Sequence, residues 1–385
     1  MVIAAQPPVP RRAPRVRHLG PNWYAAVMGT AAVGSAGAVL PWHTGPLRTG
    51  CTVVWALSLA LLVALLAARA LHWAYHGDQA RDHLLDPATA PFYGCLSMAL
   101  LAVGGGAMTV GRDPLGAAGA MALDAVLFVA GTVVGLAAAV AVPYLMVVRH
   151  RIEPAQISPV WLLPLVAPMV SAALGPQLVP HLPPGQPRQT LLLACFALFG
   201  LSLLATLLML PLVFARLIVS GPLPLALTPT LFLVLGPLGQ STTAVGAFAD
   251  VAPGVVAAPY DRGFVVLAVL YGVPVMGFAL LWLAFAAAQV ARARRRGMGF
   301  TMTWWGFTFP VGTCVTGAAA LARHTGLAAY DWLTAGLYGV LLAAWAAAAV
   351  GTVRGLISGE LPAAPRTAPA APRPATGRTT SDAVR

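Results

Sequence analysis

Ten apolar runs of about 20 residues or more divide the sequence, and they constrain its fold more than any other feature. A helix needs about 20 mostly apolar residues to cross the hydrocarbon of a bilayer, so each run predicts one membrane-spanning helix. Of the 385 residues, 59% are hydrophobic and only 9% are charged, whereas a soluble domain carries about 25% charged residues. We therefore expect an all-α integral membrane protein. The runs fall near 22–40, 51–73, 92–110, 122–148, 159–180, 189–217, 226–248, 263–290, 301–322 and 331–357.

The placement of arginine predicts the orientation of these helices. Lys and Arg together number 23, and every one of them is an arginine. With the N-terminus inside, ten spans place 18 arginines in cytoplasmic segments and five outside, which matches the excess of positive charge that cytoplasmic loops carry. We expect a multi-pass protein of the plasma membrane with both termini cytoplasmic. The outer loops then hold Arg48, Arg112, Arg188, Arg262 and Arg323.

The polar ends of the chain differ from the spans between them. Residues 1–21 are expected to be a disordered basic N-terminus, and 358–385 a disordered tail rich in Pro, Ala and Arg. The basic start followed by an apolar run resembles a secretory signal, but its removal would place arginine-rich loops on the wrong side, so we expect it to be retained. The ten-helix transport domain is predicted to occupy 22–357.

Proline, glycine and hydroxyl residues favour the odd-numbered spans, and this alternation points to an inner and an outer set of helices. The fifth, seventh and ninth spans contain prolines such as Pro168, Pro237 and Pro310, whereas the second has neither Gly nor Pro. Proline removes a backbone hydrogen bond, so we expect kinked odd helices whose unpaired groups line a narrow polar conduit. The plainer interpretation is that membrane helices are rich in small residues that pack closely, as expected of Gly131 and Gly135.

Ionisable residues are scarce inside the spans, which limits the possible chemistry. The histidines fall in loops or at helix ends, and the four cysteines (Cys51, Cys95, Cys195, Cys314) lie far apart in apolar runs. We therefore predict no catalytic set, no metal site, no cofactor and no nucleic-acid partner. Asp124 is the one acidic candidate for proton coupling, although the start of its run near residue 122 favours a solvated position at the outer interface.

Five short stretches together resemble one family of transporters. They are GPNWYAAVMGTAAVG, PFYGCLSMAL, WLLPLVAP, PTLFLVLGPLGQ and WWGFTFPVG, and they open or lie in the five odd spans. As a set they resemble the tellurite-resistance/dicarboxylate transporter family, which includes slow-type anion channels, the fungal malate permease and the fungal sulfite efflux pump. The resemblance covers roughly residues 20–357.

The resemblance implies five helical hairpins in a quasi-five-fold arrangement, odd helices inside, in a homotrimer with one pore per subunit. It implies that a phenylalanine of the ninth span closes the pore beside a glycine of the first, here Phe309 and Gly29, with Phe307 as the rival for the plug. Packing in the core is the plainer role for both rings. Further pore-lining candidates are Asn22, Trp23, Thr30, Ser97, Pro168, Gly236, Pro237, Gln240, Thr242, Phe307, Pro310 and Thr313.

Two functions remain open on the sequence. One is a channel or facilitator for small inorganic or organic anions, in which weak hydrogen bonds hold an ion in a neutral pore and release it. The other is a proton-coupled carrier of malate, sulfite or a tellurite-like oxyanion, for which Asp124 would have to titrate. A membrane-embedded enzyme is disfavoured because the spans lack clusters of ionisable residues.

Overall fold

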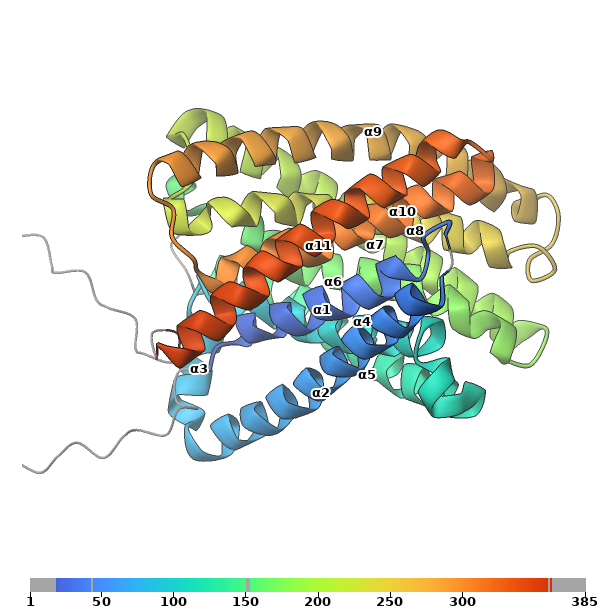
Figure 1. Cartoon of the computed structure of the whole chain (residues 1–385), viewed down its shortest axis with the longest axis horizontal. Coiled ribbons are helices and arrows are strands. Elements are labelled where there is room, and N and C mark those ends of the chain that lie inside the picture. Colours follow the sequence, from blue (N-terminus) through green and yellow to red (C-terminus); the bar gives the residue numbers. More distant parts are fainter. Residues whose placement is uncertain (1–18, 43, 150–152, 359–360, 362–385) are drawn as a thin grey trace, which may run out of the picture.

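The computed structural model describes residues 19–42, 44–149, 153–358 and 361, and all regular elements in these ranges are helices (Figure 1). The predicted terminal segments lie almost wholly outside the described residues. The α-helices are α1 (Tyr24–Gly37), α2 (Gly45–Tyr75), α3 (Gly77–Leu85), α4 (Tyr93–Thr109), α5 (Arg112–Val148), α6 (Leu162–Leu174), α7 (Gln186–Ser220), α8 (Leu235–Val251), α9 (Tyr260–Arg295), α10 (Thr308–Thr325) and α11 (Ala328–Ile357). The 3-10 helices are η1 (Pro21–Trp23), η2 (Ala90–Phe92), η3 (Pro154–Gln156), η4 (Pro159–Trp161), η5 (Gly175–His181), η6 (Leu225–Val234) and η7 (Met302–Phe307).

Nine helical stretches of the described chain are long and apolar enough to cross a bilayer. They correspond to nine of the ten predicted runs. The first run forms η1 and α1, and α1 has only 14 residues, fewer than a typical span needs. The multi-pass membrane architecture is therefore confirmed.

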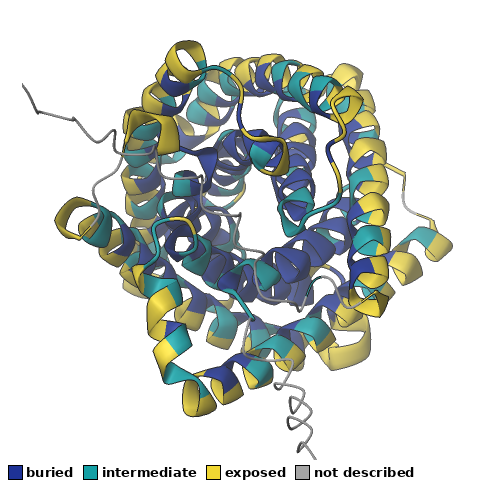
Figure 2. Cartoon of the chain, turned by 90° about the vertical axis from the view of Figure 1, so that its left-hand side faces the viewer, coloured by how far each residue is buried: buried dark blue, intermediate teal, exposed yellow. Residues whose placement is uncertain are grey.

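Burial divides the helices into two sets (Figure 2). In the most apolar stretch of each span, 22–28% of the residues are buried in α2, α5, α7, α9 and α11. The corresponding share is 78–89% in the four spans that contain α4, α6, α8 and α10. In α1 every residue but Ser35 is buried. The odd spans therefore lie inside and the even ones outside, as the distribution of Pro and Gly predicts.

The inner helices contact one another in a closed order. α1 packs against α4, α4 against α6, α6 against α8, α8 against α10, and α10 returns to α1. Each outer helix packs against the inner helix that precedes it in the chain and also against the next one, and α11 closes the circle by contacting α1. The 3-10 helices η1, η2, η4, η6 and η7, which lead into the inner α-helices, touch in the same circular order.

The prolines act differently from the expected kinks. Pro21, Pro91, Pro159 and Pro229 lie in the 3-10 helices that precede the inner α-helices. Pro310, expected in the middle of a span, is the third residue of α10. A missing N–H costs little in a first turn, where the donor has no intrahelical partner. The inner spans are thus divided into a 3-10 part and an α part, and of the three prolines named in the sequence analysis only Pro168 lies in the interior of an α-helix, whereas Pro237 and Pro310 are third residues of α8 and α10.

Small residues permit close packing between the two sets. A Cβ atom on Gly131 of α5 would lie 2.7 Å from Leu101 Cγ of α4, and one on Gly135 would lie 2.6 Å from Ser97 Oγ. Ser97 also donates a hydrogen bond to the carbonyl of Gly131 at 2.6 Å. The predicted role of this glycine pair in helix packing is therefore confirmed.

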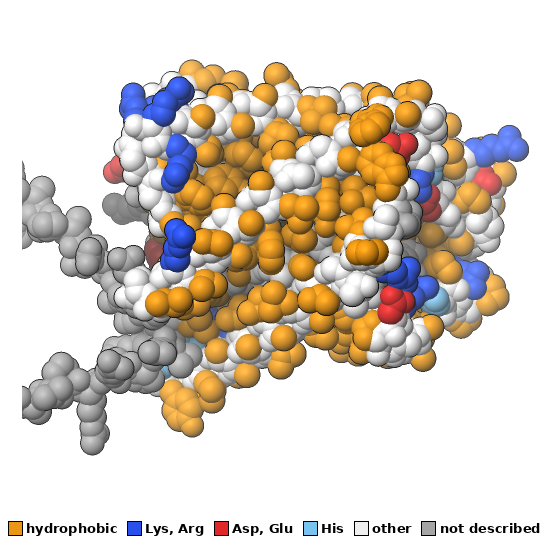
Figure 3. All heavy atoms as spheres, in the orientation of Figure 1, with side chains coloured by type: hydrophobic (Ala, Val, Ile, Leu, Met, Phe, Trp, Pro, Cys, Tyr) orange, Lys and Arg blue, Asp and Glu red, His pale blue; other side chains and the backbone are white. Residues whose placement is uncertain are grey.

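The two ends of the molecule differ in charge (Figure 3). We call the end that carries α3 and the 3-10 circle the α3 end, and the opposite one, where the inner helices finish, the vestibule end. The described arginines of the α3 end are Arg69, Arg81, Arg149, Arg216, Arg292, Arg294, Arg295, Arg296 and Arg354, and those of the vestibule end are the five assigned above to outer loops.

Candidate functional site

Three cavities follow one another along the axis between the inner helices. The apolar cavity, of about 10 Å³, is lined by Met28, Met98, Leu162, Leu163, Val166, Leu233, Gly236, Phe309 and Pro310. The hydroxyl cavity, of about 70 Å³, is lined by Ala32, Ser35, Ala102, Leu174, Gln240, Thr243, Phe309, Gly312, Thr313 and Thr316. The vestibule, of about 690 Å³, is lined by Ala38, Val39, Leu40, Pro41, Thr109, Ala173, Pro176, Gln177, Ala247, Asp250, Val251, Ala319, Ala322, Arg323 and Asp331.

Every one of these cavities is bounded by residues of all five inner spans, which places it on the axis. From one cavity to the next, the lining residues of the inner spans lie, as a set, further along the chain. On α10 they run from Phe309 through Thr313 to Arg323, and on α8 from Gly236 through Gln240 to Asp250. The cavities therefore lie in series from the α3 end to the vestibule end.

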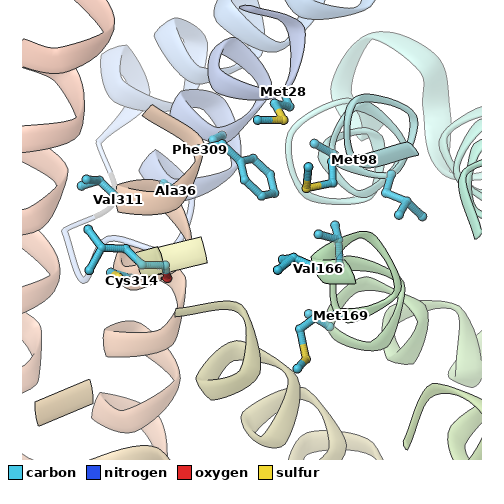
Figure 4. Packing of buried hydrophobic residues seen from close by; sticks show 14 of the residues in the cluster. Met28, Ala36, Met98, Val166, Met169, Phe309, Val311 and Cys314 are labelled. Atoms are coloured by element: carbon cyan, nitrogen blue, oxygen red, sulfur yellow. Dashed lines mark hydrogen bonds between the residues drawn. The ribbon is translucent and has the colours of Figure 1, made fainter. Parts of the chain in front are cut away.

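Phe309 is the residue that the apolar and hydroxyl cavities share. Its side chain points from α10 toward Met28 of α1 and Met98 of α4, whereas Val311 points away from them (Figure 4). Phe309 is only 6% exposed. The ring therefore stands between the two smallest of the three cavities.

The two sides of the Phe309 ring differ in chemistry. The apolar cavity has room for about one water molecule, since a water needs about 10–15 Å³. The hydroxyl cavity exposes Ser35, Thr243, Thr313 and Thr316 and the amide of Gln240. Thr243 and Thr316 hydrogen-bond to each other at 2.7 Å. None of the described residues that line these two cavities is ionisable, so a passing ion would meet only dipoles there.

Among the described residues that line the three axial cavities, the charged ones lie in the vestibule. Arg323 of α10 donates a hydrogen bond to Asp250 of α8 at 3.0 Å, and His324 Nε2 lies 3.1 Å from the other carboxylate oxygen. The side chains of Arg323 and Asp250 are 50% and 42% exposed, so water screens their interaction. The guanidinium of Arg323 is thus held at the wide mouth of the series of cavities.

The two residues that the resemblance singles out beside Phe309 lie off this axis. A Cβ on Gly29 would meet the side chains of Thr308 and Trp305 first, so Gly29 packs closely against the residue that precedes Phe309. Phe307 stacks edge-on against Phe232, with ring centroids 4.8 Å apart. Neither residue lines the three cavities.

Among the other predicted lining residues, Gly236, Gln240, Pro310 and Thr313 do reach the cavities. The side chains of three polar candidates are instead engaged by neighbouring helices: Thr30 accepts a hydrogen bond from Trp345 of α11, Ser97 bonds to α5, and Thr242 packs on Gly272 of α9. Pro168 and Pro237 are buried within the inner set, and Asn22 and Trp23 form η1 at the α3 end.

Sequence reasoning missed Ser35, Thr243 and Thr316 of the hydroxyl cavity. The signal that finds them is helical periodicity, because residues three and four apart share one face of a helix. Gln240 leads to Thr243 by a step of three, and Thr313 leads to Thr316 in the same way.

The solvated position expected for Asp124 was wrong. The helix begins at Arg112 and is kinked at Gly116, where φ is 72°, so its continuous part still starts ahead of the predicted residue 122 and Asp124 lies inside α5. It is 1% exposed, its Oδ2 accepts a hydrogen bond from Gln177 Nε2 at 2.9 Å, and Gly104 of α4 lies close to its Oδ1. Gln177 lines the vestibule, so Asp124 is separated from that cavity by one amide side chain.

The model of one family, described as voltage-dependent anion channel, matches residues 18–353. The chain belongs to the voltage-dependent anion channel family. The family resemblance drawn from the five sequence stretches is thereby confirmed.

Relatives of this voltage-dependent anion channel family member are transporters by description. An uncharacterized transporter of Methanocaldococcus jannaschii is 24% identical over 347 residues, which cover 90% of this chain and 96% of the relative. A sulfite efflux pump of Arthroderma otae is 25% identical over 341 residues, with 86% and 88% covered. A sulfite efflux pump of Trichophyton rubrum is 25% identical over 329 residues, with 83% and 85% covered. This member is accordingly a transmembrane anion channel or transporter.

Proposed function

We propose that this protein conducts small anions along the axis of its five inner helices and that the Phe309 ring closes the path. The observation that carries the proposal is the series of three cavities, each bounded by all five inner spans, with Phe309 shared by the two narrowest. A path bounded by one subunit needs no second chain to complete it.

Selectivity for anions follows from dipoles rather than from fixed charge. The α-helices α6, α8 and α10 begin at Leu162, Leu235 and Thr308, beside the apolar cavity, where their aligned peptide dipoles contribute positive potential although the N–H of each first residue donates to the preceding 3-10 helix. On the far side of the ring, the amide of Gln240 can donate hydrogen bonds to an anion, and so can the hydroxyls of Thr243, Thr313 and Thr316 once they rotate away from the backbone carbonyls to which they donate here. Such donors hold an ion weakly enough to release it, which permits flux.

The proposed architecture has ten spans, with η1 and α1 as the short first one, in five hairpins around the pore. The closed order of inner contacts and the outer helices that bridge neighbouring hairpins support a quasi-five-fold arrangement. We place the protein in the plasma membrane. The excess of arginines at the α3 end supports an orientation in which that end faces the cytoplasm. The family resemblance supports a homotrimer with one path per subunit and a transport domain over 22–357.

Sulfite is the substrate we propose first, because two sulfite efflux pumps match more than four fifths of this chain. The test is flux from proteoliposomes that contain sulfite, chloride, nitrate, malate or tellurite, each at two pH values. We expect sulfite to leave faster than malate, because no described residue that lines the two smaller cavities is a cation that could grip two carboxylates. Equal leakage from empty liposomes and proteoliposomes for all five anions would refute anion conduction.

A proton-coupled carrier is the second candidate, and the burial of Asp124 supports it. A carboxylate that loses its water is costly to keep ionised, and its one hydrogen-bond donor among the described residues is the amide of Gln177. Asp124→Asn would then abolish acceleration of uptake by an imposed pH gradient while leaving downhill flux at equal pH intact. Uptake that responds to the gradient equally in both proteins would exclude this role.

A further inference from the structure

A second cavity with a buried charge lies at the α3 end, outside the axial series. It measures about 330 Å³ and is lined by parts of η4 and η6, by the turn before α4, and by Arg216 of α7. Arg216 is only 7% exposed. We call this space the Arg216 cavity.

The positive charge of Arg216 has no acidic partner among the described residues. Its Nε donates to the carbonyl of Ala155 at 3.2 Å and its Nη1 to the carbonyl of Gly221 at 2.6 Å. These two bonds tie η3 to the loop after α7, and they leave Nη2 without a described acceptor. Carbonyl dipoles do not neutralise a cation, and buried charges are normally paired with an opposite charge.

The surroundings of Arg216 are mainly apolar. Phe92, Trp161 and Leu227 line the cavity together with the polar side chains of Gln156 and Ser158, and no described lining residue is acidic. A free, strongly hydrated inorganic anion would lose its water against these apolar groups. An anion attached to an apolar body fits both parts of the lining.

The Arg216 cavity adjoins a groove on the lipid-facing side of the protein. The groove, also about 330 Å³, lies between α5 and α7, where it is lined by Pro143, Val147 and Met209. Ile157 and Trp161 line both spaces, so the cavity and the groove are continuous at these two side chains. Val147 is 83% exposed, as expected of a residue that faces acyl chains. Glu153 lines the groove but not the Arg216 cavity.

We propose that an anionic phospholipid of the leaflet at the α3 end binds here, with its phosphate at Arg216 and one acyl chain in the groove between α5 and α7. The phosphate supplies the counter-charge that Arg216 lacks, and the groove takes the chain that a free anion would not have. The binding site touches η2, η4 and η6, which lead into three of the inner helices, and it does not depend on the anion pathway proposed above.

The test is lipid binding to the full chain, measured by native mass spectrometry and by thermal unfolding in neutral detergent. The probes are long-chain phosphatidylglycerol, dihexanoyl phosphatidylglycerol, phosphatidylcholine and inorganic phosphate. We expect a single retained phosphatidylglycerol, a rise in unfolding temperature with the long-chain form, a smaller rise with the short-chain form, and none with the other two. A rise of equal size with inorganic phosphate would overturn the assignment to a lipid.

Two variants locate the site. Arg216→Gln should weaken phosphatidylglycerol binding about tenfold or more, the usual value of a hydrogen bond to a charged group. Ala88→Phe adds a bulky ring to an exposed residue at the rim of the Arg216 cavity while it leaves Arg216 and its two carbonyl bonds in place, so it should hinder lipid binding even where Arg216→Gln fails to fold. Arg292→Gln, at the same end on α9, is the matched control for charge and should bind as the wild type does. Unchanged binding to Ala88→Phe would overturn the proposal.

Discussion

Removal of the Phe309 ring should open the axial path. The ring is the only group of α10 besides Pro310 that lines the apolar cavity, and it is also the boundary of the hydroxyl cavity. In Phe309→Ala the two spaces would join, so that water could follow an anion through the narrowest part of the protein.

The size of the effect follows from the volumes on each side. The apolar cavity of about 10 Å³ holds at most about one water, and the hydroxyl cavity of about 70 Å³ holds on the order of five. An anion that reaches the closed ring must therefore give up most of its hydration, which is costly in an apolar site. We expect at least a tenfold rise in flux for Phe309→Ala, which corresponds to a barrier lower by about 1.4 kcal/mol.

Stability should fall at the same time. Substitution of a packed phenylalanine by alanine costs about 3–5 kcal/mol, and Phe309 belongs at the low end because it already borders two cavities. The matched control is Phe307→Ala, two residues away and 8% exposed, whose ring packs against Phe232 instead of the axis. We expect this control to lose comparable stability without a rise in flux.

The assay is efflux of sulfite or chloride from proteoliposomes, with equal amounts of folded protein verified by size-exclusion chromatography. Wild-type flux in a folded Phe309→Ala protein would refute the gate. A rise in Phe307→Ala as large as that in Phe309→Ala would refute the assignment to the Phe309 ring, because loosened packing would then explain both.

Three further predictions concern the mouth, the packing and the hydroxyl cavity. Arg323→Gln should slow anion entry from the vestibule end by up to about fivefold at low salt and little at high salt. The control Arg262→Gln, on α9, should leave the rate of entry unchanged. If the rate of entry depends on salt equally in Arg323→Gln and in the wild type, steering by Arg323 is refuted. Gly94→Ala places a Cβ 2.5 Å from the carbonyl oxygen of Leu163, so it should destabilise the protein by about 1–3 kcal/mol in a thermal unfolding experiment. Gly50→Ala, inside α2 with open space around it, should not lower the unfolding temperature in the same experiment, because alanine favours a helix more than glycine does. Thr316→Val removes one hydroxyl donor and leaves the shape, so it should lower flux of oxyanions more than flux of chloride; an equal change for both would argue against hydrogen bonding there.

The division into inner and outer helices could be predicted from the sequence because it leaves a chemical record. A helix that faces lipid needs a continuous apolar surface, as in α2, whereas a helix buried among others needs small residues for close approach, such as Gly94. The lengths of the runs also predicted nine spans correctly. The first run was harder, because its early residues form the 3-10 helix η1 and its last ones, after Gly37, leave the helix.

Positions on the axis were less predictable than the elements that carry them. Polar side chains in a membrane helix can bond to a neighbouring helix or face a pore, and residue type does not distinguish the two. Thr30 and Ser97 do the former, whereas Ser35 and Thr316 line the hydroxyl cavity. The position of Asp124 could not be predicted either. The charged residues Arg112 and Asp113 moved the predicted start of its run to residue 122, although both belong to α5. Contacts between helices far apart in sequence decide such cases.

The position of charge along the axis determines where anions are selected. The described ionisable lining residues lie in the vestibule, where Arg323 and Asp250 are half exposed. Electrostatic attraction at such a mouth falls off within about 8 Å at physiological salt, so it raises the rate of entry but does not act at Phe309. On the proposed path, the largest cost of dehydration then falls at the ring, where the apolar cavity leaves space for about one water. The order of permeation in the wild type should therefore follow the cost of dehydration, and Phe309→Ala should reduce the differences between anions as well as raise the flux of each.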